Sequence, residues 1–243
     1  MRGAFLTAPL ERPVYIKAPE GHARPGYVCR LRKACYGLCD APRAYFKDFA
    51  KYMRTLNVIP TASDVCLYKS RNPAYPSVWV LQYVDDLQVS GEPAEVDAFI
   101  KDLTTKYEIR DYKEPQSFIG MELTRKGNKM TLTQTKYIEQ MAARFGLLDA
   151  HYVNTPMDPN SHLTSTDQSD TRPDPTLYRA MVGSLMYAQV LTQPGLSFAV
   201  MQLSRHLARP THAHINAAKR AIVWAYHHRH LGLTFDGDRP PEP

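Results

Sequence analysis

The sequence predicts an α+β fold, in which an antiparallel sheet is followed by a largely helical region. Three observations support this prediction. Short apolar segments alternate with amphipathic stretches in residues 1–134, two of these segments flank the pair Asp85-Asp86, and residues 177–231 carry apolar side chains at helical spacing. Of the 243 residues 44% are hydrophobic, so the chain can bury one large core or two small ones.

The first region, residues 1–134, is expected to contain two helices and several strands. Residues 41–56 and 93–107 are each amphipathic, with apolar side chains on one helical face. The strands are expected at residues 65–68, 78–83, 87–89, 118–123 and 130–132. A hairpin would hold the two aspartates in its turn, and Lys126-Gly127-Asn128 would join the last two strands.

The remaining regions are expected to be mostly helical. A helix over residues 135–145 should end at Gly146, because glycine is favoured just after a helix C-terminus. Residues 153–175 are rich in Pro, Ser, Thr and Asp, which predicts a surface linker. The charged, proline-rich residues 236–243 predict a disordered tail. Three further helices are expected at residues 177–190, 195–207 and 211–231, with Pro194 suited to a first helical position.

The distribution of charge favours a polyanionic partner without requiring one. The net charge is +6, residues 24–54 hold eight basic and two acidic side chains, and no acidic residue lies between Asp174 and Asp236. These acid-poor segments suit contacts with phosphates, although solvated helix faces explain them equally well. Metal and membrane sites are not indicated. The four cysteines match no zinc-binding spacing, and the histidines of residues 206–230 are expected on different sides of helices. No apolar run is long enough to span a bilayer.

The motif that carries chemistry is the pair Asp85-Asp86 within residues 81–87, LQYVDDL. Removing two adjacent carboxylates from water is costly, and a divalent cation offsets this cost because Mg²⁺ prefers oxygen ligands. An Asp-Asp pair alone is usually an exposed turn. The tetrapeptide YVDD between two apolar strands is far more specific, and it resembles the catalytic turn of reverse transcriptases.

Other segments extend this resemblance to the reverse transcriptase of copia-type LTR retrotransposons, which is a part of their Pol polyprotein. The matching segments follow the family's order from residue 1 to about residue 235. They include residues 30–38, 41–43, 118–122, 182–187, 203–205 and 218–220. The resemblance implies a reverse transcriptase palm with an antiparallel sheet and a YVDD hairpin, followed by a helical thumb- and connection-like region.

The resemblance also implies a reaction and the residues that perform it. The expected activity is RNA-directed DNA polymerisation by two-metal nucleotidyl transfer, with Asp85 and Asp86 as catalytic ligands of Mg²⁺ or Mn²⁺. The residues expected to bind the nucleotide are Phe5, Tyr36, Gly37, Tyr83 and Val84. Those expected to form the primer grip are Phe118, Ile119 and Gly120, and those expected to make other nucleic-acid contacts are Arg205, Lys219 and Arg220. Without the resemblance, several of these would be core aromatics, plain turns or ordinary strand residues.

Partners and domains follow from the same resemblance. The expected partners are an RNA template with a DNA primer or an RNA/DNA duplex, dNTPs and the remainder of the Pol polyprotein, with no membrane. The expected location is intracellular, in a cytoplasmic particle or the nucleus. The expected domains are a partial palm with a primer-grip-like hairpin at 1–134, a thumb-like helix at 135–152, a linker at 153–175, a basic helical region at 176–235 and a tail at 236–243. The fingers and an RNase H domain are expected to be missing.

The chain departs from the family pattern at several positions. The family's first catalytic aspartate would fall directly before Met1, and no acidic residue precedes Glu11, so we expect little polymerase activity from this chain alone. Cys39-Asp40 stand where the family usually has Lys and Gln, and Gly195 where it usually has Asp. The alternative is a non-catalytic remnant or a domesticated nucleic-acid-binding fragment. A metal-dependent phosphohydrolase would need further His or Asp ligands near the turn.

Overall fold

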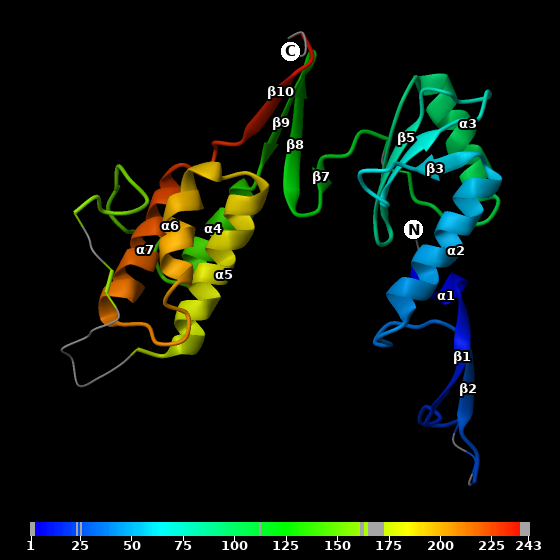
Figure 1. Cartoon of the computed structure of the whole chain (residues 1–243), viewed down its shortest axis with the longest axis horizontal. Coiled ribbons are helices and arrows are strands. Elements are labelled where there is room, and N and C mark those ends of the chain that lie inside the picture. The colour runs from blue at the N-terminus through cyan, green and yellow to red at the C-terminus, as the bar shows by residue number, and fades with distance from the viewer. Residues whose placement is uncertain are drawn as a thin grey trace. The chain divides into compact units, whose positions relative to one another are not determined.

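The chain folds into two compact units, Met1–Glu114 and Pro115–Pro243 (Figure 1). The computed structural model describes residues 3–22, 24, 26–111, 113–160, 163–164 and 173–238. Both units combine helices with antiparallel sheets, so the predicted α+β class is confirmed. Within the described ranges, no helix is both long and apolar enough to cross a membrane. The predicted tail beyond residue 238, and the predicted linker at 161–162 and 165–172, lie outside the described residues.

The N-terminal unit is built on a four-stranded antiparallel sheet in the order β3-β4-β5-β6. The strands are β3 (Val58–Pro60), β4 (Leu67–Ser70), β5 (Trp79–Tyr83) and β6 (Asp86–Ser90), and the helices are α2 (Ala41–Thr55) and α3 (Pro93–Thr104). Helices and strands contribute buried side chains to one core, among them Tyr45, Phe49, Met53, Tyr68, Val80, Phe99 and Leu103.

Helix α2 follows the predicted periodicity. Tyr45, Phe49 and Met53 are four residues apart, so their side chains form one buried stripe. Pro42 lies in the first turn, where its missing N–H costs no intrahelical hydrogen bond. After the helix, Asn57 turns the chain with φ of 58°, a left-handed conformation that asparagine adopts more often than most residues.

A two-stranded antiparallel arm precedes α2. It consists of β1 (Pro9–Ile16) and β2 (Cys29–Lys33), and it follows the short helix α1 (Ala4–Thr7). The arm lies at one end of α2, and the four-stranded sheet lies at the other (Figure 1). The register shifts between the pairs Pro9–Lys33 and Val14–Leu31, which forms a bulge in β1. The arm was not predicted, because most of β1 is exposed and lacks the alternation of a half-buried strand.

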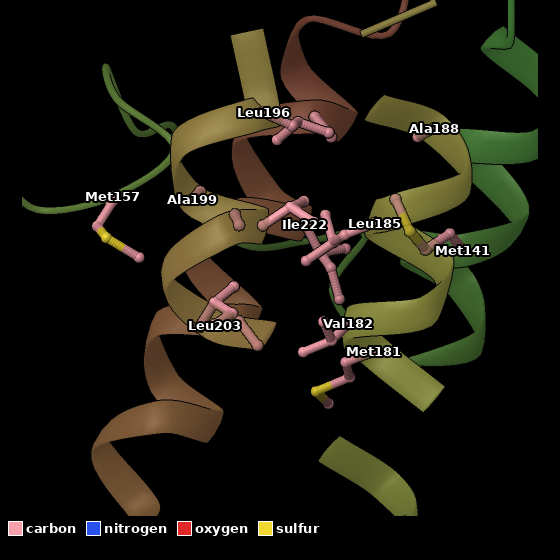
Figure 2. Packing of buried hydrophobic residues seen from close by; sticks show 14 of the residues in the cluster. Met141, Met157, Met181, Val182, Leu185, Ala188, Leu196, Ala199, Leu203 and Ile222 are labelled. Carbon is pink, nitrogen blue, oxygen red and sulfur yellow. The ribbon is translucent and has the colours of Figure 1, made fainter. Parts of the chain in front are cut away.

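The C-terminal unit combines a helical bundle with a second four-stranded sheet in the order β10-β9-β8-β7. The helices are α4 (Thr135–Arg144), α5 (Pro175–Leu191), the 3₁₀ helix η1 (Pro194–Leu196), α6 (Ser197–Ser204) and α7 (His212–His227). The strands are β7 (Ser117–Phe118), β8 (Met121–Lys126), β9 (Lys129–Thr133) and β10 (Leu233–Asp236). The helices share one core, which includes Met141, Leu185, Leu196, Leu203 and Ile222 (Figure 2).

Helix α4 ends where the sequence predicted. Gly146 has φ of 68°, and its amide donates to the Ala143 carbonyl at 3.1 Å. The next amide, of Leu147, donates to the Ala142 carbonyl at 2.9 Å. This pair of hydrogen bonds is the Schellman motif, which satisfies carbonyls left open at the end of the helix.

The strand expected at residues 118–123 is interrupted, which corrects the prediction. Ile119 and Gly120 have φ of 50° and 72° and form a tight turn, so that Phe118 pairs with Met121. Positive φ at both central positions is the geometry of a two-residue type I′ hairpin. The alternation of residues here favoured a continuous strand. A turn was not expected, because isoleucine is an unusual residue at a turn position with positive φ.

Strand β10 was not predicted, and it accounts for the boundary between the units. Leu233 pairs with Leu132, so the chain returns to the sheet after α7, which ends at His227 rather than near residue 231. The β8–β9 hairpin therefore belongs to the C-terminal unit, and the chain divides after Glu114. The sequence had grouped this hairpin with residues 1–134, because a strand partner far along the chain leaves no local pattern.

Packing in the bundle predicts a large difference between two positions on α5. Leu185 is fully buried, whereas the Val190 side chain is 68% exposed. We expect Leu185→Ala to lower the unfolding free energy of the C-terminal unit by about 2–5 kcal/mol, because it leaves a cavity. Val190→Ala should change it by less than about 0.5 kcal/mol. Urea unfolding followed by Trp224 fluorescence, in a Trp79→Phe background, measures both, and equal effects would contradict the assigned core.

Candidate active site

The pair Asp85-Asp86 lies at the tip of the β5–β6 hairpin. Tyr83 pairs with Asp86, so Val84 and Asp85 form the turn, and both Tyr83 and Val84 are exposed. Val84 has φ of 53°, which places a β-branched residue in the left-handed region at a cost of about 1–3 kcal/mol. Such strain persists only where neighbouring structure holds it, and it concentrates at functional sites.

A buried polar side chain holds this turn from behind. Gln82 is 5% exposed, and its Nε2 donates to the Val84 carbonyl at 3.4 Å. Its Oε1 accepts a hydrogen bond of 3.1 Å from the Tyr68 hydroxyl on β4. Gln82 was not identified from the sequence. The sequence did contain a sign of this role. Gln82 lies two residues after Val80, so both side chains face the inward side of β5, where a buried amide needs hydrogen-bond partners.

The two carboxylates lie in different surroundings. Asp86 is exposed, whereas Asp85 is half-buried and lies near the Tyr45 phenol of α2. Burial and, to a lesser degree, the negative charge of Asp85 raise the pKa of Tyr45. The phenol therefore stays neutral at physiological pH, and it adds no second negative charge beside Asp85.

Tyr45 also contacts a residue that the resemblance assigned to nucleotide binding. The Phe5 ring of α1 lies 5.9 Å from the Tyr45 ring and 4.8 Å from the Tyr36 ring, measured between centroids. Tyr36 is exposed, and Gly37 after it has φ of 92°. Phe5 and Asp85 therefore lie beside one buried tyrosine. Tyr45 was not identified from the sequence, because a tyrosine on an amphipathic helix is usually a core aromatic.

The hairpin tip offers ligands of the kind that Mg²⁺ uses. Mg²⁺ is commonly bound by one or two carboxylates, while water and substrate phosphates complete its coordination. Asp85 and Asp86 are adjacent carboxylates on a turn with exposed neighbours, so they fit this pattern. Across the described ranges, no three His, Cys, Asp or Glu side chains gather into a metal-binding group.

The arm formed by β1 and β2 presents a basic and aromatic face. Tyr15 pairs with Arg30, so the two side chains share one face, and Arg32 lies two residues further along that face. All three residues are exposed. Arg12, Arg30 and Arg32 also line a hollow of about 550 Å³ at the bulge. Exposed arginines beside an aromatic ring suit the phosphates and bases of a single nucleic-acid strand.

Asp40, which departs from the family pattern, connects the arm to α2. Its carboxylate accepts a hydrogen bond from the Arg12 guanidinium. Nearby, Lys47 Nζ donates to Glu11 Oε1 at 2.6 Å, which lowers the pKa of Glu11. Both ion pairs are exposed and contribute little to stability. They link the bulge of β1 to α2, and the Asp40 carboxylate is paired with Arg12 in this chain.

The residues assigned to the primer grip form a second strained turn. Ile119 and Gly120 connect β7 to β8, and Phe118 is half-buried at the end of β7. Among the described non-glycine residues with positive φ, Val84 and Ile119 are the β-branched ones. The hydroxyl of Tyr187 on α5 donates to the Ile119 carbonyl at 3.0 Å.

The three basic residues assigned to nucleic-acid contacts differ in their surroundings. Arg205 is exposed and donates to Gln202 Oε1 at 3.2 Å, whereas Lys219 is half-buried. Arg220 donates from Nε and Nη2 to the carbonyl and hydroxyl of Thr155, at 3.2 and 3.1 Å. Arg205 is therefore the most available of the three, while Arg220 anchors the segment around Thr155 to α7.

Gly195, the other departure from the family pattern, is packed against an indole ring. A Cβ at Gly195 would lie 2.9 Å from Cη2 of Trp224 on α7. The indole also stacks on His228, with 4.5 Å between ring centroids. The space for a side chain at position 195 is therefore taken, and the aspartate usual in the family would not fit unless Trp224 moved.

Comparisons with known proteins agree on one family. A family model described as reverse transcriptase (RNA-dependent DNA polymerase) matches residues 1–159. The retrovirus-related Pol polyprotein from transposon RE1 of Arabidopsis thaliana is 36% identical over an alignment of 226 positions. The retrovirus-related Pol polyprotein from transposon TNT 1-94 of Nicotiana tabacum is 34% identical over an alignment of 251 positions, gaps included. These alignments cover 91% and 99% of this chain but 15% and 19% of the relatives. No solved structure matches the chain.

The strained turn predicts an unusual response to glycine. Val84→Gly should leave the unfolding free energy of the N-terminal unit unchanged or raise it by up to about 1 kcal/mol, because relief of strain offsets the entropy cost of glycine. Val89→Gly, in the regular part of β6, should lower it by about 1 kcal/mol or more. Urea unfolding followed by Trp79 fluorescence, in a Trp224→Phe background, compares them. Similar losses in both variants would show that Val84 is unstrained.

Proposed function

Because this chain belongs to the reverse transcriptase (RNA-dependent DNA polymerase) family, as found in copia-type retrotransposon Pol polyproteins, we propose that it takes part in RNA-directed DNA synthesis. The observation that carries this proposal is the strained turn that presents Asp85 and Asp86 beside Tyr45. If this hairpin had no function, glycine or asparagine at position 84 would form the same turn with less strain than valine.

The two aspartates would hold the catalytic metal. Asp85 would be the main ligand of Mg²⁺ or Mn²⁺ and Asp86 its weaker companion. When bound, the ions would activate the primer 3′-hydroxyl and neutralise charge on the phosphates. Asp85 is half-buried and lies near the Tyr45 phenol of α2, whereas Asp86 is exposed and would be free to turn toward substrate. Tyr83 and Val84, exposed at the same tip, would lie beside the primer end.

The aromatic residues beside the hairpin would form the nucleotide pocket. Phe5 would lie under the sugar of the dNTP, where a bulky ring excludes a 2′-hydroxyl, and Tyr36 and Gly37 would line the pocket. Contacts of Phe5 with Tyr36 and Tyr45 support this proposal, because they restrict the ring from two sides.

Other parts of the chain would hold the nucleic acid. The primer grip would comprise Phe118, Ile119 and Gly120, while Arg205 and Lys219 would contact duplex phosphates. The partial palm with its primer-grip-like hairpin would comprise residues 1–134, of which 115–134 belong to the C-terminal unit. The thumb-like helix would lie in residues 135–152 and the basic helical region in residues 176–235. The chain spans less than a fifth of the length of the relatives described above, so the remainder of the Pol polyprotein is a proposed partner. A cytoplasmic particle or the nucleus is the proposed location.

A second candidate is a nucleic-acid-binding fragment without catalysis. The basic and aromatic face of the arm favours it, because Tyr15, Arg30 and Arg32 could bind a single strand without any metal. The two candidates make different predictions for the hairpin tip and similar ones for the arm. Metal binding and primer extension therefore separate them.

Divalent-ion binding tests the role of the hairpin tip. Asp85→Asn should raise the Kd for Mn²⁺ by at least about tenfold, because it replaces a charged oxygen ligand with a neutral amide. Asp97→Asn, an exposed position on α3, is the control and should change the Kd little. Proton relaxation of water in Mn²⁺ titrations measures both. Equal Mn²⁺ affinity in the Asp85→Asn variant and the unaltered chain would remove the metal-binding role.

Primer extension then distinguishes the polymerase from the binding fragment. Extension of a DNA primer on an RNA template that Asp85→Asn abolishes would support the polymerase. Template binding without extension, at saturating Mg²⁺, would support the second candidate. The low activity expected from the sequence remains a prediction, and the same assay tests it.

Salt dependence tests the arm. The double variant Arg30→Gln/Arg32→Gln should weaken binding to single-stranded RNA and reduce the slope of log K against log salt by about 1.4, since two phosphate contacts are lost at about 0.7 each. Arg71→Gln/Lys101→Gln removes the same charge outside the arm, from the residue after β4 and from α3, and should alter the slope little. Fluorescence anisotropy at several salt concentrations measures the slope. An equal loss in both variants would indicate only a general charge effect.

A further inference from the structure

Tyr187 on α5 reaches across to the turn between β7 and β8. Its hydroxyl donates to the Ile119 carbonyl at 3.0 Å, and a Cβ at Gly120 would overlap the same hydroxyl. The Tyr187 ring meets the Tyr137 ring of α4 edge to face, 4.8 Å between centroids. Tyr137 is itself held by a hydrogen bond of 3.0 Å to the Ser184 carbonyl. Two helices thus fix the side chain that contacts the turn.

This contact determines which way one peptide group of the turn faces. In a trans peptide the carbonyl and the following N–H point in opposite directions, and no peptide bond in the described residues is cis. Because the Ile119 carbonyl points to Tyr187, the Gly120 N–H points away from α5. Gly120 is exposed, and no hydrogen bond within the described residues uses its N–H. The turn therefore presents a backbone donor to solvent.

The turn would not hold this orientation unaided. Ile119 is β-branched and has φ of 50°, whereas isoleucine prefers the extended or right-handed regions. A type I turn would relieve the strain, but it would rotate the Ile119–Gly120 peptide and redirect both of its polar groups. The hydrogen bond from Tyr187 opposes that rotation, because it is made only while the carbonyl faces α5.

We propose that Tyr187 is a positioning residue for the primer strand. Its hydroxyl keeps the Gly120 N–H directed outward, where it donates to a phosphate oxygen of the primer backbone. Backbone N–H groups commonly bind phosphates and fix the register of a nucleic acid without reading its sequence. This proposal rests on the proposed function of the β7–β8 turn as a primer grip. Gly120 has two roles in it, since it permits the left-handed turn and leaves room for the tyrosine.

Hydrogen exchange on the chain alone tests the contact. Tyr187→Phe keeps the ring and removes the hydroxyl, so the turn should open more often. The amide of Met121, which pairs with Phe118 across the turn, should then exchange at least about tenfold faster, while the amides of α5 remain unchanged. Tyr178→Phe is the control, because it removes a hydrogen bond from another tyrosine of α5, to the Leu203 carbonyl at 2.8 Å, that does not involve the turn. NMR-detected exchange resolves these amides. Unchanged exchange at Met121 would overturn the proposal.

A double-mutant cycle tests the same contact through Gly120. Gly120→Ala introduces both backbone strain and overlap with the Tyr187 hydroxyl. In a Tyr187→Phe background only the strain remains, so the alanine should change the unfolding equilibrium constant at least about fivefold less. Equal effects of the alanine in both backgrounds would show that the hydroxyl does not contact the turn, and would also overturn the proposal.

Binding of primed and unprimed RNA templates tests the function. The unaltered chain should prefer the primed template, which is a test of the primer grip itself. Tyr187→Phe should raise the Kd for the primed template at least about threefold and leave the Kd for the unprimed template unchanged. Tyr178→Phe should change neither Kd. Equal weakening on both templates would overturn the positioning role. A chain without preference for the primed template would refute the primer grip, while hydrogen exchange would still report on the contact.

Discussion

A β-branched residue held in the left-handed backbone region is the constraint on which both proposed contact points depend. Val84 does this at the β5–β6 turn and Ile119 at the β7–β8 turn. Each is supported by a polar side chain from inside its own unit, the amide of Gln82 in one case and the hydroxyl of Tyr187 in the other. In both turns a single hydrogen bond to a backbone carbonyl opposes relaxation of the strained residue. In each unit a polar side chain thus holds the carbonyl of the strained residue at a hairpin tip.

The proposed metal ligands and the basic surfaces lie in different parts of the chain. Asp85 and Asp86 occupy one hairpin tip, whereas the arm carries exposed arginines and residues 175–235 carry no acidic side chain. This separation favours approach of a polyanion to the basic surfaces, and it leaves the repulsion between the paired carboxylates to be relieved by a metal. The phenol of Tyr45 beside Asp85 is neutral, so it adds no further negative charge to the hairpin tip.

The departures from the family pattern are accommodated by local structure. Asp40 accepts a hydrogen bond from Arg12, and Gly195 makes room for the indole of Trp224. Arg220, which the resemblance assigned to nucleic-acid contacts, donates to the carbonyl and hydroxyl of Thr155. Residue type and net charge could not separate such structural roles from binding roles. The separation required knowledge of which neighbour lies within hydrogen-bond distance.

The sequence by itself determined the α+β class and the helices near 41–56, 93–107 and 135–145, because burial imposes a periodicity that each segment shows alone. It also determined the stop at Gly146, because glycine adopts the left-handed conformation that ends a helix. Only the tertiary structure decided that β10 returns to β9, that β1 and β2 form an arm, and that residues 118–123 break at Ile119-Gly120. It also brought Phe5 and Asp85 to Tyr45, and Tyr187 to Ile119. These contacts join residues distant in sequence, and a positive φ at isoleucine or valine opposes local preference. Neither leaves a trace in a local pattern, since each exists only after the surrounding elements have packed.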